Sequence, residues 1–209
     1  TLHSGGSDPN RVEGSSVLAG LTFRLNHDRL DRPVFPRSGT AVRARFDKRG
    51  RSLGGDFDYS RFQVDGQGYI PVSDRSTIQF GAGAGYTHGT VPFYDLFYVG
   101  GGSPAERASR PFSGLDRDEL IVNQVGTVGA GYRYRIFANP LSFLRQGFLT
   151  GSYNAVIFST RRESPYDFDR IHGAAIGIAL DTMAGPIQAS GGWGESGRLH
   201  FYISIGPAF

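Results

Sequence analysis

Cysteine is absent from the 209-residue sequence, lysine occurs once, at Lys48, and no long run of apolar residues is present. Without cysteine the chain forms neither disulfides nor thiolate sites, which is compatible with an oxidising compartment. A transmembrane helix needs roughly 18 or more consecutive apolar residues, so the sequence excludes a helical membrane protein. The N-terminus lacks the basic and apolar segments of a signal peptide, and it starts at Thr1. We therefore expect the chain to be a piece of a longer protein.

Strong charge and the usual catalytic patterns are also missing. The formal net charge is only +3, and the arginines are spread along the sequence, so nucleic acid is not expected as a partner. The histidines are scattered without the spacing of metal ligands, which argues against a metal site. No serine lies in a Gly-x-Ser-x-Gly elbow and no Ser/His/Asp set can be assembled. The sequence thus predicts a protein that is not an enzyme and needs no cofactor.

Glycine and aromatic residues are abundant instead, with 31 Gly, 16 Phe and 10 Tyr, and polar and apolar residues alternate over many short segments. The clearest segment is 77–87, where Ile78, Phe80 and Ala82 share one phase with Ala84 and Tyr86. Alternation with period two is typical of β-strands. We expect about nine strands, near 17–26, 40–47, 57–70, 77–87, 122–136, 147–158, 171–181, 187–193 and 199–209.

The composition of the two strand faces indicates which of them meets water. One face carries Gly, Thr, Ser, Gln and Arg, and the other is apolar with Tyr and Phe toward its ends, which suits a wet lumen and a lipid-facing surface. Most of the expected strands reach the roughly 9 to 11 residues that cross a bilayer. A soluble all-β domain is the alternative, because alternation alone does not say which face points inward. We predict an all-β fold, a transmembrane antiparallel β-barrel.

Nine strands cannot stand in a bilayer as an open sheet, since unpaired backbone groups in hydrocarbon cost several kcal/mol each. Either strands that precede this chain complete the barrel, or two chains do. We expect residues 1–14 to be a loop or truncated end and residues 15–209 to form the barrel domain. The longest gap between strands, residues 97–120, is rich in glycine and contains Phe112, Ser113, Gly114 and Leu115. We predict that this central loop folds back into the lumen.

Several motifs together resemble the BamA/TamA superfamily of outer-membrane barrels, also called the bacterial surface antigen family. The Asp-rich turn with Asp31, Phe35, Pro36 and Gly39 resembles its Phe-Pro-x-x-Gly hairpin turn, and the central loop resembles its lumen-inserted loop. The closest resemblance is to the translocators of patatin-like type Vd autotransporters. It is carried by three stretches, which are Gly100 to Leu120, Tyr132 to Ile136, and Leu180 to Pro186 followed by Gly194 to Arg198.

The resemblance covers residues 17–209 and implies that the chain is the C-terminal part of a roughly 16-stranded barrel in the bacterial outer membrane. One departure is that Ser113 stands where the superfamily's loop usually has an arginine. We expect the loop to dock on the strand that carries Tyr153 and Asn154. We also expect Phe201, Ile203, Ile205 and Phe209, on one phase of the last strand, to form the signal that outer-membrane assembly machinery reads.

The resemblance implies a translocator or assembly pore that moves or inserts a polypeptide, its own upstream passenger in the autotransporter case, across or into the outer membrane. Its expected partners are the lipid bilayer, that polypeptide and the assembly machinery. Two alternatives stay open, a passive outer-membrane pore and a membrane anchor for an upstream patatin-like phospholipase. The number of chains in the working barrel also stays open, including a homo-oligomer.

Overall fold

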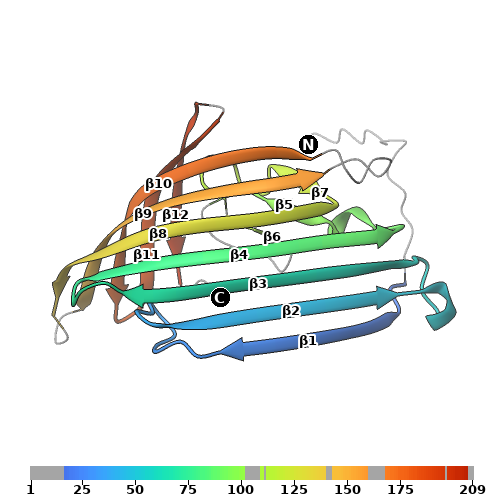
Figure 1. Ribbon diagram of the computed structural model, residues 1–209, viewed down its shortest axis with the longest axis horizontal. Helices are drawn as coiled ribbons and strands as arrows, with labels where there is room; N and C mark the ends of the chain where they lie inside the picture. The colour runs from blue at the N-terminus through green and yellow to red at the C-terminus, as the bar shows by residue number, and fades with distance from the viewer. Residues whose placement is uncertain are drawn as a thin grey trace, which may run out of the picture.

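A computed structural model describes residues 17–101, 109–110, 112–139, 143–159, 168–195 and 197–206. Nine strands of the described chain form one antiparallel sheet in the order β1-β2-β3-β4-β8-β9-β10-β11-β12 (Figure 1). These strands are β1 (Gly20–Asp28), β2 (Gly39–Arg49), β3 (Tyr59–Pro71), β4 (Ser76–Gly89), β8 (Gln124–Ala138), β9 (Leu144–Ser159), β10 (Asp169–Thr182), β11 (Gly185–Gly194) and β12 (Leu199–Ile205). The prediction of nine antiparallel strands is therefore confirmed.

Three short strands inside the central loop were not predicted from the sequence. They are β5 (Phe97–Val99), β6 (Ser109–Arg110) and β7 (Leu120–Val122), and they form a separate sheet in the order β6-β5-β7. Runs of two or three residues are too short for their period to be recognised. The described residues also contain two short 3-10 helices, η1 (Arg51–Leu53) and η2 (Phe93–Asp95). No helix in the described part of the chain is long and apolar enough to cross a membrane.

Most strand boundaries lie within two or three residues of the prediction, and β8, β9 and β10 are 14 to 16 residues long. Tilted strands of roughly 9 to 11 residues already cross the apolar core of a bilayer, so these strands project beyond it. The last strand is the exception, because β12 ends at Ile205 after seven residues. The predicted extension of this strand to Phe209 lies partly outside the described residues, which stop at 206.

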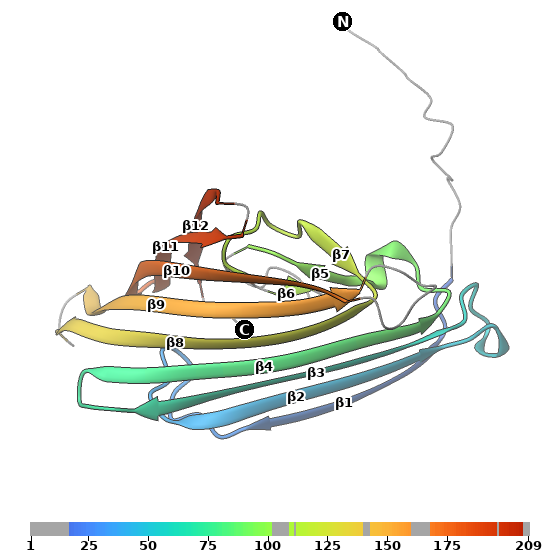
Figure 2. The same cartoon turned by 45° about the horizontal axis from the view of Figure 1, so that its top comes forward.

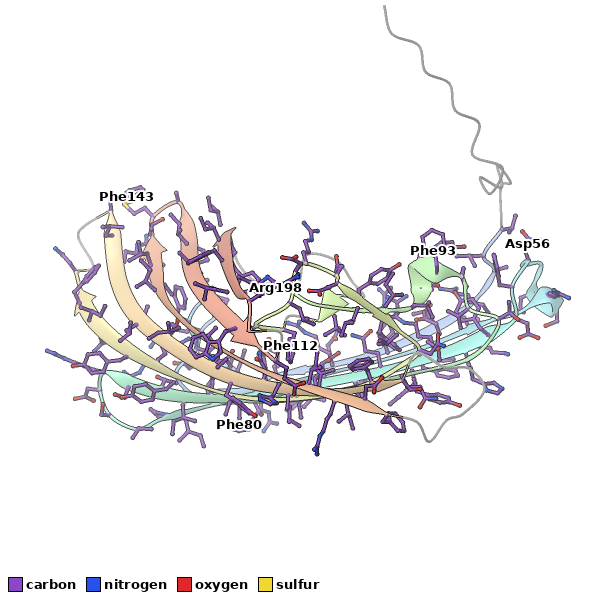
Figure 3. All side chains as sticks on the ribbon, turned by 90° about the horizontal axis from the view of Figure 1, so that it is seen from above. Asp56, Phe80, Phe93, Phe112, Phe143 and Arg198 are labelled. Carbon is purple, nitrogen blue, oxygen red and sulfur yellow. The ribbon has the colours of Figure 1, made fainter. Side chains whose placement is uncertain are left out.

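The large apolar side chains of the sheet lie on its outer, convex face. Figure 3 shows Phe80 on this side of the sheet, and Phe112 on the concave side. Exposure is high along the whole face, with Phe23 at 63%, Ile176 at 55%, Ile178 at 49% and Ile203 at 77%. A soluble domain would bury this phase of its strands. The alternative of a soluble all-β domain is therefore wrong, since its apolar face would be left in water.

The inner, concave face holds the central loop, which lies against the sheet in both Figure 1 and Figure 2. The buried apolar cluster is formed there, between loop and wall, by Phe97, Val99, Phe112, Val122, Val125, Val156 and Phe158. β1 and β12 each pair with one neighbour among the described strands, so the sheet forms a curved wall with two edges. The described strands therefore form an open, curved sheet.

The two ends of the wall differ in the length of their connections. At one end the connections include residues 29–38, 72–75 and 183–184, and at the other end they include residues 50–58 and the much longer segment 90–123. Figure 3 shows Phe143 at the first end and Asp56 and Phe93 at the second. We call these the short-turn end and the long-loop end.

Candidate functional site: a loop and a turn on the inner face

The central loop is anchored to the long-loop end of the wall by aromatic and aliphatic packing. Phe97 and Phe112 are at most 1% exposed, and Leu115, Leu120 and Ile171 pack against their cluster. The ring of Phe97 covers Gly85 of β4, and the guanidinium of Arg61 lies 4.6 Å from its centroid. Burying one such aromatic side chain stabilises the docked loop by roughly 1.5 to 3 kcal/mol. This packing holds the described part of the loop against the inner face of the wall.

The tip of the loop rests on three glycines of β10 and β11, which we call the glycine cradle (Gly173, Gly192 and Gly194). A Cβ atom at Gly173 would collide with the backbone carbonyl of Ser113, and one at Gly192 would lie 3.2 Å from the Cβ of Ser113. Gly114 itself has φ +97°, a left-handed conformation that favours glycine. A Cβ atom at Gly114 would collide with the backbone of Gly194. The loop and the wall therefore meet backbone to backbone.

Tyr202 of β12 binds this backbone directly. Its hydroxyl accepts a hydrogen bond from the amide of Gly114 at 2.9 Å and donates one to the carbonyl of Leu115 at 2.8 Å. The neighbouring His200 places Nδ1 3.1 Å from Oδ1 of Asp116. Because β12 is an edge strand of the described sheet, these contacts tie the central loop to the strand that ends the wall.

Backbone hydrogen bonds close the loop on itself. The amide of Phe112 donates to the carbonyl of Gly101 at 2.9 Å, and the amide of Gly101 donates to the carbonyl of Leu115 at 3.2 Å. Oε2 of Glu119 accepts from the amide of Asp116 at 2.6 Å. These bonds shape the Phe-Ser-Gly-Leu segment before it meets the wall, and none of them requires an arginine at position 113.

The expected docking wall is only partly correct. Tyr153 is 54% exposed and lies on the outer face of β9, so its assignment to the docking wall is wrong. Asn154 has the opposite phase, faces inward and lies in register with Gly173, the residue that the loop contacts. The tip of the loop docks on β10 and β11, because the glycines that allow its backbone to approach lie on these two strands, and on Tyr202 of β12.

A second inserted segment, the β1–β2 turn (residues 29–38), lies at the short-turn end. Asp31 shapes it, since its Oδ1 accepts hydrogen bonds from the amides of Arg37 at 2.8 Å and Ser38 at 3.2 Å. Gly39 has φ +105°, and a Cβ there would collide with the carbonyl of Arg29. Burial is the largest single influence on the Asp31 carboxyl and raises its pKa, but the two amides and the guanidinium of Arg32 together outweigh it and hold that pKa below its ordinary value.

The other two residues of this turn motif contact the wall. The guanidinium of Arg133, on β8, donates to the carbonyl of Pro36 and lies 5.5 Å from the ring centroid of Phe35. Phe35 in turn packs on Phe148 with 4.9 Å between ring centroids, and Arg133 is only 6% exposed. The predicted motif residues Asp31, Phe35, Pro36 and Gly39 thus form one turn that is pinned to the inner face.

The proposed C-terminal signal residues that are described share one face. Phe201, Ile203 and Ile205 are each more than three quarters exposed on the outer face of β12, whereas Phe209 lies outside the described residues. Sequence reasoning missed Tyr202, Arg133 and the glycine cradle. Tyr202 lies on the polar phase of β12, and the Gly-Gly-Trp-Gly run at 191–194 is the one signal that could have pointed to the cradle. Among the described residues no group of three or more potential metal ligands is present.

Comparison with known proteins places this arrangement in a family. A family model described as the Omp85 superfamily domain matches residues 7–209. Among solved structures, the chain is similar to the crystal structure of BamA from Haemophilus ducreyi lacking POTRA domains 1–3, with a TM-score of 0.67 and 17% sequence identity. This match covers 89% of the present chain and 40% of the BamA chain. The chain thus spans less than half the length of the protein that it resembles in fold.

Proposed function

The chain belongs to the Omp85 superfamily and is part of a bacterial outer-membrane β-barrel protein, and from this premise we propose that the barrel moves or inserts a polypeptide. One observation carries the proposal. The central loop occupies the inner face at the long-loop end and is held there by Tyr202 of the edge strand β12. The segment that obstructs the lumen and the strand at which the wall ends are therefore bound to each other.

The proposed mechanism of passage depends on β12 being the last strand of the described sheet. In the described sheet this strand pairs with β11, and we propose that its other side forms the seam with the first strand of the complete barrel. Opening that seam exposes amide and carbonyl groups, which cost several kcal/mol each in hydrocarbon, and an incoming strand can satisfy them by adding to the edge. We propose that release of the loop from Tyr202 frees the lumen and loosens β12 at the same time, which lets a polypeptide pass or pair.

We further propose that the polypeptide is the protein's own upstream passenger, as in type Vd autotransporters with a patatin-like domain. The resemblance of the loop, of Tyr132 to Ile136 and of the last two hairpins supports this assignment. In this proposal the barrel performs no chemistry and binds no cofactor. The exposed apolar phase of β12, with Phe201, Ile203 and Ile205, would then be the surface that assembly machinery recognises.

A passive pore is the second candidate, and the arginines on the inner face of β1 to β3 favour it because they could select anions. The packed central loop supports the gated translocator instead, since Phe97 and Phe112 fill the space next to the wall with buried aromatic rings. A pore for small solutes needs an open path past its constriction.

A disulfide lock tests the proposal, because the native sequence contains no cysteine that could interfere. The pair Asp116→Cys and His200→Cys replaces two side chains that already touch, at 3.1 Å. In the full-length protein, oxidation should stop delivery of the passenger, and reduction should restore it. Val128→Cys with Ala155→Cys, which links two outer-face partners of β8 and β9, is the matched control and should leave delivery unchanged. Normal delivery by the locked barrel would contradict the proposal.

A further inference from the structure

Five arginines gather on the inner face of the first three strands. Arg61 of β3 faces inward because its guanidinium covers Phe97 of the central loop. Asp47 of β2 lies opposite Arg61 in register, and Thr22 of β1 lies opposite Asp47. Strand alternation therefore assigns every second residue of these strands to the inner face. We call the resulting set of arginines the basic track: it comprises Arg24, Arg43, Arg45, Arg49 and Arg61.

The register arranges the basic track in four successive rows across the strands. Arg49 lies in the first row, Arg61 in the second, Arg24 with Arg45 in the third, and Arg43 in the fourth. Adjacent rows are two residues apart along each strand, which corresponds to about 7 Å, so the four rows extend over about 20 Å of the wall. The track therefore runs along the direction in which a chain would cross the membrane.

The basic track carries an excess of positive charge. Its rows contain two aspartates, Asp47 and Asp65, against five arginines, which leaves an excess of three charges. Asp47 is 2% exposed and already occupied, since it accepts from Thr22 at 2.6 Å and pairs with Arg45 at 2.7 Å and Arg49 at 3.4 Å. The negative charge of Asp47 is therefore neutralised by Arg45 and Arg49 and does not balance Arg24, Arg43 or Arg61.

Arg24 and Arg43 are the members of the track that the wall holds least, although Arg43 lies opposite Asp65 in register. Both are exposed, and within the described residues neither guanidinium makes a hydrogen bond or an ion pair. Arg24 lies directly opposite Arg45, a like-charged pair that destabilises an antiparallel sheet. Folding alone therefore gives no reason for an arginine at position 24.

The inner face of the middle strands, β8 to β10, shows that this wall can be lined by uncharged residues. In the middle of β8, β9 and β10 the inward residues are Thr127, Gly129, Gly131, Thr150, Ser152, Asn154, Ala175 and Gly177. None of them is charged. Since uncharged polar residues suffice to line that side, solvation of the lumen does not account for the concentration of arginine on β1 to β3.

We propose that the basic track binds acidic, extended stretches of the polypeptide during its passage, a proposal that rests on the translocator function above. An extended chain presents every second side chain on one side, with a repeat of about 7 Å, which equals the spacing of the rows. Carboxylates at alternate positions can therefore meet successive rows of guanidinium groups, with which they form strong, often bidentate hydrogen bonds. A small anion would meet only one row.

Peptide binding to the purified full-length protein, kept in detergent micelles so that both ends of the barrel meet solvent, tests this proposal. The probes are two fluorescent peptides of twelve or so residues, one alternating Gly and Asp and the other alternating Gly and Asn. We expect the acidic peptide to bind at least about tenfold more tightly, and its advantage to shrink as salt is raised. Arg24→Glu with Arg43→Glu should remove that advantage.

Two variants control for folding and for general charge. Arg24→Lys with Arg43→Lys keeps the charge and should retain most of the preference, while Arg75→Glu, in the turn between β3 and β4, removes a cation away from the track and should retain all of it. Folding of each variant is checked by the mobility of the unheated barrel on a gel.

The outcomes separate this proposal from the proposed function. Equal affinity for the two peptides, or an undiminished preference in the folded glutamate variant, would overturn the basic track as a binding surface even if the passenger is delivered. Preferential acidic binding by a protein whose locked loop still delivers its passenger would instead overturn the gated translocator and leave the track in place.

Discussion

The two segments inserted into the wall are held by different kinds of contact. At the long-loop end the central loop presents its backbone, so that Gly114 and Leu115 are bound by the hydroxyl of Tyr202 and rest on glycines of the wall. At the short-turn end the wall presents a side chain, because the guanidinium of Arg133 reaches the carbonyl of Pro36 and the ring of Phe35.

This difference explains how the loop docks with Ser113 where the family usually has an arginine. A charged side chain at the loop tip is one way to attach it to the wall, and close backbone approach is another. The second way depends on residues that lack side chains, so adding atoms to those glycines disrupts it. The attachment of the turn is disrupted by removing a single guanidinium.

Gly173→Ala should give the largest effect. The new Cβ would collide with the backbone carbonyl of Ser113. Because the colliding atoms belong to the backbone of the loop and of the wall, neither segment can move away without a loss of stability. We expect a loss of about 3 kcal/mol in the free energy of unfolding, the upper range for overpacking. Urea titration of the folded barrel measures it, and cleavage by trypsin after Arg117 reports release of the loop. Gly81→Ala is the control, since the nearest atom to its Cβ is 3.5 Å away. Equal effects at the two positions would contradict the cradle.

Arg133→Met should come next, with a loss of about 2 kcal/mol. The substitution keeps the aliphatic bulk but removes a charged hydrogen bond to Pro36 and the contacts with three aromatic rings, those of Phe35, Tyr69 and Phe148. The turn should become accessible, which labelling of a cysteine at Val34 would detect. Arg135→Met removes only an exposed hydrogen bond to Asp74, so it should cost clearly less. A turn that stays protected in Arg133→Met would show that Asp31 and the strand register are sufficient.

Tyr202→Phe should cost about 1.5 kcal/mol, because two hydrogen bonds to the loop backbone are lost while the ring remains. Combining this change with the others sharpens the comparison. Tyr202→Phe and Gly173→Ala disturb the same contact, so their effects on unfolding should not add. Tyr202→Phe and Arg133→Met act at opposite ends of the wall and should add within about 0.5 kcal/mol. Additivity in both pairs would mean that the cradle and Tyr202 do not form one docking site.

Period-two alternation predicted the nine strands and their apolar phase, because the pattern is local and repeats over ten or more residues in most strands. The turn motif was predictable for the same reason, since Asp31 and Gly39 act within one hairpin. The docking site of the loop was not, and Tyr153 was chosen where the true contacts are Gly173 and Tyr202. Contacts between residues 88 positions apart depend on the register of three strands, which no local pattern contains.

The basic track illustrates the same limit. Along the sequence its arginines are interrupted by apolar and acidic residues and form no patch. Only the pairing of β1 with β2 and of β2 with β3 brings Arg24, Arg45 and Arg61 onto adjacent rows of one face. The sequence therefore predicts which face of its strand each arginine occupies, but it does not predict which residues lie beside it on the neighbouring strands.

Asp31→Asn is expected to give the smallest effect and a characteristic dependence on pH. The folded state lowers the pKa of Asp31, so its carboxylate stabilises the turn above the ordinary aspartate pKa of about 4. That stabilisation is lost as the pH falls through the lowered pKa of the folded state. At pH 7 the substitution should cost at most about 1 kcal/mol, since the partly exposed carboxylate is screened by solvent. Toward pH 2 the two proteins should converge in unfolding free energy, measured by urea titration at each pH. Asp74→Asn, in the neighbouring turn, is the control and should follow the wild type throughout. If the cost of Asp31→Asn stayed constant down to pH 2, the contacts of residue 31 with the amides of Arg37 and Ser38 would stabilise the turn independently of the charge at that position.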